Sequence, residues 1–207
     1  MIKRTMGRSL LTLLVVTGLA GTINDNSISK KERKFGIGIM KDTRDNAVSA
    51  TKGLSEAQYN FKPAPERWSV KECMYHIAGA EKLLWTLFEN TMKVPANPEK
   101  RAEIKMTDEQ VIKMIEDRSV KAQAPEPIQP KNTGFTVLTD AVEDFKKHRG
   151  EHIKYLKNST EDLRNHVAQL PVGYIDCYQL LLFIAAHSNR HTQQMNEVKA
   201  SPGFPPK

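Results

Sequence analysis

The chain has 207 residues, of which 39% are hydrophobic, and this is enough to bury one core and form one domain. Its formal net charge is +7, but Lys3, Arg4 and Arg8 supply three of these charges, and the remaining +4 is mild. Since the sequence also lacks a basic stripe interleaved with aromatics, a zinc-finger signature and a helix-turn-helix signature, we do not expect it to bind nucleic acid.

The N-terminus has the pattern of a targeting segment. Three basic residues precede the apolar run from Leu10 to Ala20, and Gly18 and Ala20 provide small residues before a cleavage site at Gly21. The run is too short to span a bilayer comfortably. We therefore predict a signal peptide at 1–20, a flexible polar tether at 21–31, and a secreted or periplasmic protein. There are two alternatives to a signal peptide. The segment could be an uncleaved, membrane-associated one, or it could be an apolar start without a targeting role in a cytoplasmic protein.

The rest of the chain is dominated by helical periodicity, and strand patterns are scarce. Ser69 and Glu72 have the spacing of a capping box, so a helix should begin at about Val70. A proline-rich connection covers 93–134, and a turn is expected at 171–173. In chain order we predict helices at about 32–52, 70–91, 107–119 and 136–157, and a last one from behind Asp176 to about Lys199, with a loop at 54–67.

Four of these helices are long, and they form two helical hairpins joined by one long crossover. This order predicts an all-α four-helix bundle over residues 32–204. Cys73 and Cys177 should lie at different heights in the bundle and stay unpaired. The expected core includes the following apolar residues: Leu83, Leu84, Leu87, Phe88, Phe145, Leu180 and Ile184.

Three histidines fall on apolar helical stripes. His187 and His191 are four residues apart, so both imidazoles lie on one face of the last helix, in line with Leu180 and Ile184. His76 lies on the stripe of the helix that begins near Val70. Three histidines with an open coordination position are typical of a catalytic metal site, because a structural site normally has four protein ligands. Alternatively, each is a core histidine with a hydrogen-bond partner.

A second pair, His148 and His152, also has the four-residue spacing. Lysines, Arg149 and Glu151 surround it, and Gly150 lies between the two histidines, so we interpret this stretch as a solvated, weaker part of its helix. His166, in a polar stretch, is expected at the surface.

The stretches 54–78 and 186–199 together resemble the DinB-like superfamily of metal-dependent enzymes. The resemblance rests on a histidine that follows a W-S-x-x-E cap, Trp68 to Glu72 here, and on a later H-x-x-x-H. It implies a four-helix bundle, often a dimer, that binds a divalent metal such as nickel, zinc, iron or manganese. His76, His187 and His191 match the family's ligand positions.

The resemblance leaves the reaction open. It is compatible with a metal-dependent hydrolase or with a thiol-dependent transferase acting on a small molecule, and the predicted export counts against a cytosolic thiol. Glu72 could support His76, but we interpret it as a cap, and no general base stands out. The alternative is a non-catalytic binding protein that a metal stabilises.

Overall fold

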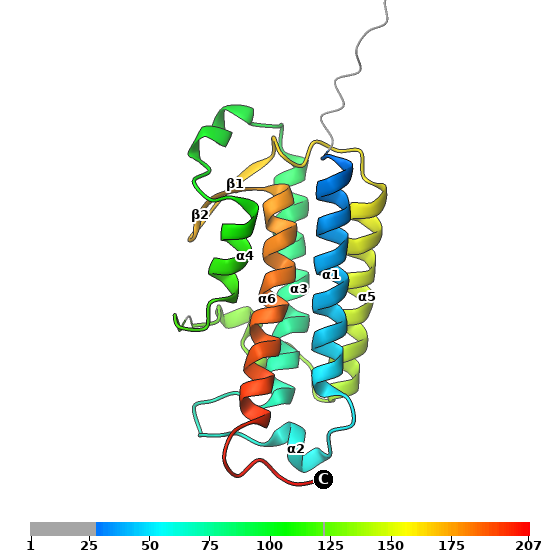
Figure 1. Cartoon of the computed structure of the whole chain (residues 1–207), viewed down its shortest axis with the longest axis vertical. Coiled ribbons are helices and arrows are strands. Elements are labelled where there is room, and N and C mark those ends of the chain that lie inside the picture. Colours follow the sequence, from blue (N-terminus) through cyan, green and yellow to red (C-terminus); the bar gives the residue numbers. More distant parts are fainter. Residues whose placement is uncertain (1–27, 122) are drawn as a thin grey trace, which may run out of the picture.

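A computed structural model describes residues 28–121 and 123–207 of the chain (Figure 1). The predicted signal peptide and most of the predicted tether lie outside the described residues. Among the described residues, no helix combines the length and the apolar character needed to cross a membrane.

Four long helices stand side by side and confirm the prediction of an all-α four-helix bundle (Figure 1). The helices α5 and α6 each pack against both α1 and α3. Helices joined along the chain, α1 with α3 and α5 with α6, therefore lie diagonally across the bundle, an arrangement that simple hairpins do not have. The bounds are α1 (Lys30–Thr51), α3 (Val70–Lys93), α5 (Leu138–Asn158) and α6 (Cys177–Lys199).

Capping boxes decide where several helices begin. Ser69 and Glu72 cap α3 as predicted. A second box, Ser29 with Glu32, starts α1 two residues before the expected position. A third forms where we predicted only a loop: Ser55 and its partner Gln58 start the short helix α2 (Glu56–Asn60). In each box, side-chain oxygens accept hydrogen bonds from backbone N–H groups that the first helical turn leaves free.

The crossover between α3 and α5 carries α4 (Asp108–Glu116), which packs on α6 and ends three residues before its predicted end. Three short 3-10 helices accompany it: η1 (Pro98–Glu103), η2 (Glu126–Ile128) and η3 (Pro130–Asn132). After α5, the strands β1 (Val167–Leu170) and β2 (Gly173–Asp176) pair antiparallel around the predicted turn. We did not predict these strands, which have only four residues each.

The core lies between the four long helices. Phe88, Phe145, Leu180 and Ile184 are buried there as expected, whereas the prediction for Leu83 is wrong, because 42% of its surface is exposed. Cys73 and Cys177 are buried and free, which confirms that they are unpaired.

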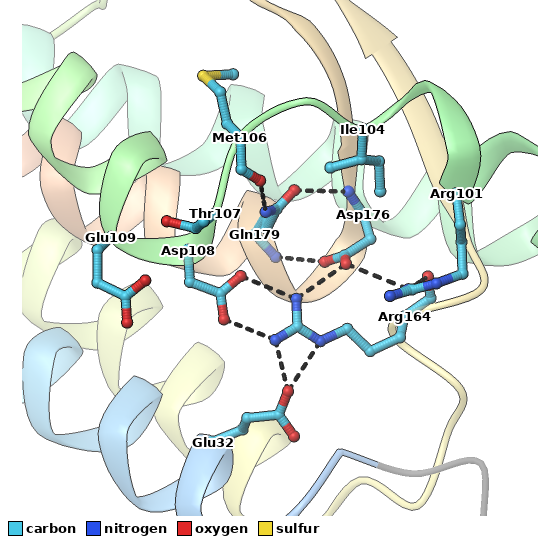
Figure 2. Close-up of a pocket in the computed structure, with 10 residues that line it drawn as sticks. All are labelled: Glu32, Arg101, Ile104, Met106, Thr107, Asp108, Glu109, Arg164, Asp176 and Gln179. Atoms are coloured by element: carbon cyan, nitrogen blue, oxygen red, sulfur yellow. Dashed lines mark hydrogen bonds and ion pairs between the residues drawn. The ribbon is translucent and has the colours of Figure 1, made fainter.

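An ion cluster ties together the first turns of three helices (Figure 2). Arg164 donates to Glu32 of α1, to Asp108 of α4 and to Asp176, the N-cap of α6, at distances from 2.5 to 3.0 Å. Carboxylates at helix N-termini are stabilised by the helix dipole, and the guanidinium compensates their mutual repulsion. The depression of about 490 Å³ at this cluster thus has most of its charges already paired, and its lining does not include His76, His187 or His191.

Candidate metal centre

The structure brings His76, His187 and His191 together between α3 and α6. One ring nitrogen of each lies within 4.8 Å of the corresponding nitrogens of the other two. The Nε2 atoms of His76 and His187 are 3.3 Å apart. His76 and His191 are buried and His187 is half-buried, so the group stands at the edge of the core.

Hydrogen bonds fix which nitrogen of His76 can bind a ligand. Its Nδ1 lies 2.7 Å from the carbonyl oxygen of Ile128, in η2 of the crossover. A carbonyl oxygen only accepts, so Nδ1 donates its hydrogen and Nε2, which faces His187, carries the lone pair. A metal-ligating histidine usually has such an acceptor on its second nitrogen.

Aromatic side chains surround the three imidazoles. The indole of Trp68, the residue just before the α3 cap, lies 4.9 Å from the ring of His76 and 5.9 Å from that of His191, measured between centroids. The ring of Phe183, one turn before His187, lies parallel to its imidazole at 6.4 Å. These apolar neighbours limit rotation of the imidazoles and keep water from their faces.

Burial keeps the three histidines neutral. Desolvation lowers the pKa of each below the usual value, and the neighbouring imidazoles add to the effect at His187 and His191. The pKa of His187 falls to about 3. Neutral imidazole is the form that binds metal ions, so at neutral pH the donor set needs no deprotonation.

The donor set fits a divalent cation of the zinc type. Two nitrogens bound tetrahedrally at about 2.0–2.1 Å from one ion would be about 3.4 Å apart. The His76 and His187 Nε2 atoms already have that spacing, at 3.3 Å. Since Nε2 of His76 presents a lone pair there, the site needs no rearrangement of that ligand.

The other histidine pair has a different environment from the one we predicted. The interpretation of its helix as solvated is wrong for Arg149 and His152, which are buried, with 0% and 1% of their surfaces exposed. His152 Nδ1 lies 2.8 Å from Glu81 Oε1, and its ring stacks on Trp85 at 3.9 Å. Only His148 is near the surface, where it faces Asp144 and Glu151. His166 is half-buried, with Nδ1 3.2 Å from the carbonyl oxygen of Thr91.

Sequence reasoning missed part of the site. It treated Trp68 as a residue of the helix start, and it did not single out the Ile128 carbonyl or Gln194, whose Oε1 lies 2.9 Å from His191 Nδ1. Gln194 could have been found, because it follows His191 by three residues on the same helical face. Nothing in the sequence pattern points to Ile128, since its contribution depends on the path of the crossover.

Comparison with known proteins identifies the family. The model of the DinB superfamily matches residues 39–195, a range that includes all three histidines. The chain belongs to the DinB superfamily. Among its relatives is the uncharacterized protein YuaE of Bacillus subtilis, 25% identical over 164 residues, which are 79% of this chain and 96% of YuaE.

A solved structure shows the same fold. YfiT from Bacillus subtilis is described as a probable metal-dependent hydrolase with an unusual four-helix bundle topology. It is similar to this chain with a TM-score of 0.60 and 15% sequence identity, over 86% of this chain and 92% of YfiT. At that identity, the likeness shows the bundle fold and leaves the activity to be argued from the site.

Proposed function

We propose that this DinB superfamily protein binds a divalent metal ion through His76, His187 and His191 and catalyses a metal-dependent hydrolysis. The convergence of three neutral imidazoles at the edge of the core carries the proposal. With three protein ligands, one coordination position stays available for water or substrate. A bound divalent ion would act there as a Lewis acid and lower the pKa of a water molecule.

The surrounding residues hold the donors in place. The Ile128 carbonyl fixes the tautomer of His76, and Trp68 restricts the rings of His76 and His191. We place hydrolysis ahead of thiol-dependent transfer because hydrolysis needs only water as its second reactant. The description of YfiT as a probable metal-dependent hydrolase supports the same choice.

Metal analysis of protein purified without an affinity tag tests the proposal. We expect about one nickel, zinc, iron or manganese ion per chain in the wild-type protein, and loss of that ion in His187→Ala. His148→Ala is the matched control, because His148 is near the surface, where it faces Asp144 and Glu151, and does not belong to the three-histidine group. Full metal content in His187→Ala would refute the ligand assignment.

Activity is tested with chromogenic carboxylic and phosphate esters. Hydrolysis should stop when a chelator removes the metal, return when the metal is restored, and be absent in His187→Ala. Stoichiometric metal without hydrolysis of any of these esters would contradict the enzyme proposal and favour a non-catalytic, metal-stabilised binding protein.

A further inference from the structure

Gln194 is in contact with the candidate metal centre without belonging to it. It follows His191 by three residues on α6, and its Oε1 lies 2.9 Å from His191 Nδ1. A glutamine amide offers either an oxygen or an NH2 group, and at that position each would select a different tautomer of the imidazole. The orientation of this amide therefore decides which nitrogen of His191 carries a lone pair.

Arg118 determines that orientation. Its Nη1 lies 3.3 Å from the same Oε1 atom of Gln194. A guanidinium has donors only, so the atom it meets must be the amide oxygen. That oxygen also accepts the hydrogen of His191 Nδ1, and His191 Nε2 is left with the lone pair that a metal requires.

Arg118 is itself held in place. Its Nε and Nη2 donate to the two carboxylate oxygens of Glu197, at 3.0 and 2.8 Å. Arg190 donates to the carbonyl oxygens of Ile115, Asp117 and Val120 and so fastens the segment that carries Arg118 against α6. Two parallel bonds to one carboxylate give the guanidinium a defined direction.

We infer that Gln194 is a positioning residue that holds His191 in its metal-binding tautomer, and that Arg118 keeps the Gln194 amide oriented for this task. The inference rests on the proposed metal site and adds a residue from the crossover to it. Substitution of a partner that orients a ligating histidine typically weakens metal binding by about 10- to 100-fold.

Zinc titration of the full-length chain against a competing chelator tests the inference. Gln194→Met keeps the side-chain length but removes the acceptor, and it should weaken zinc binding about 10- to 100-fold. Gln194→Glu retains an acceptor oxygen and should bind zinc within a few-fold of wild type. The zinc affinity of Arg118→Met should lie between those of Gln194→Met and Gln194→Glu. Gln193→Met is the matched control, because Gln193 is also half-buried and makes no hydrogen bond to a histidine within residues 28–121 and 123–207.

A second measurement separates positioning from a general loss of structure. In chelator-treated protein with ¹⁵N-labelled histidine, long-range ¹H–¹⁵N correlations report which ring nitrogen of His191 is protonated. Wild type, Gln194→Glu and Gln193→Met should show the Nδ1–H form, and Gln194→Met should show a mixture. Unchanged tautomer and zinc affinity in Gln194→Met would overturn the inference.

The two measurements also separate this inference from the proposed function. If wild-type protein binds no zinc, nickel, iron or manganese, the proposed function fails. The tautomer of His191 in Gln194→Met then still decides whether Gln194 positions the imidazole.

Discussion

Glu81 and Arg149 form a bidentate ion pair at the centre of the bundle, with two N–O distances of 2.7 Å. The same guanidinium donates to the Met40 carbonyl and the Thr43 hydroxyl of α1, and to the Ile184 carbonyl and the Ser188 hydroxyl of α6. Arg149 lies on α5 and Glu81 on α3, so one side chain connects all four long helices. Ser188 is next to His187, and the ion pair thereby adjoins the candidate metal centre.

Removing either member of this pair should be strongly destabilising, because the other charge is left buried without a partner. We expect Glu81→Gln and Arg149→Met each to lower the free energy of unfolding by about 3–5 kcal/mol, and the double variant to lower it by less than the sum. Chemical denaturation measures these values. The control is Glu143→Gln in the exposed pair with Lys146, which should cost less than about 1 kcal/mol. Additive losses in the double variant would show that the pair is not coupled.

The same pair makes stability sensitive to acid. Burial would raise the pKa of Glu81, but Arg149 and the hydrogen bond from His152 outweigh it and hold this pKa at about 2. The unfolded carboxyl titrates near 4.5, so the stabilisation is present above that pH and is lost as pH falls toward 2. In denaturation series, the stability difference between wild type and Glu81→Gln should shrink between pH 4.5 and 2. A stability difference that stays constant over this pH range would contradict the lowered pKa of Glu81.

The Arg164 cluster gives a second stability prediction. Arg164→Met leaves Asp176 buried without its closest cation, at 2.9 Å, and frees Glu32 and Asp108 to repel one another. We expect a loss of about 2–3 kcal/mol in the free energy of unfolding. Arg101→Met is the matched control: it also reaches Asp176, at 3.5 Å, but is 42% exposed, and should cost under about 1 kcal/mol. Equal losses in the two variants would refute a special role for Arg164.

The bundle and the histidine positions could be predicted because both depend on local periodicity. The stripe that carries His187 and His191, and the cap that places His76 on α3, are properties of single helices. The buried environment of Arg149 and His152 could not be read in this way. Lysines flank them in sequence, yet their partner Glu81 comes from another helix 68 residues away from Arg149.

The contacts that the crossover makes at the candidate metal centre could not be predicted from the sequence either. The Ile128 carbonyl meets His76 of α3, and Arg118 meets Gln194 of α6, through the path of a proline-rich segment. Capping and periodicity predict individual helices. They do not predict where a long connection packs against the bundle. The short strands β1 and β2 escaped prediction for a related reason, since four residues give too little alternation to detect.

We propose that the protein is exported and that its mature form begins near Gly21. The basic start and the apolar run from Leu10 to Ala20 support this. N-terminal sequencing of natively expressed protein, together with cell fractionation, provides the measurement. Intact residues 1–20 in soluble cytoplasmic material would refute export, and a retained segment in the membrane fraction would favour an uncleaved anchor.

Metal binding should stabilise the fold by mass action. An ion that binds only the folded protein adds about 2.7 kcal/mol when its free concentration is one hundred times its dissociation constant. We expect thermal unfolding of the wild-type protein to shift upward with added zinc, and His191→Ala to lose most of the shift. His148→Ala should keep it. His152→Ala should also keep the shift but start from a lower melting temperature, because it removes a buried partner of Glu81.

Zinc affinity should depend on pH less steeply than it would for exposed histidines. At pH 5.5, three imidazoles with a pKa near 6.5 would each be about 90% protonated, and affinity would fall about a thousandfold. Burial lowers the pKa of all three histidines here, that of His187 to about 3, so the folded site should take up fewer protons at pH 5.5 than three exposed imidazoles would. We expect the zinc dissociation constant of the wild-type protein, measured by competition at pH 7.5 and 5.5, to change by less than about tenfold after correction for the chelator. A thousandfold loss would mean that the three imidazoles are open to water and protons, and it would contradict the buried, neutral site that the structure describes.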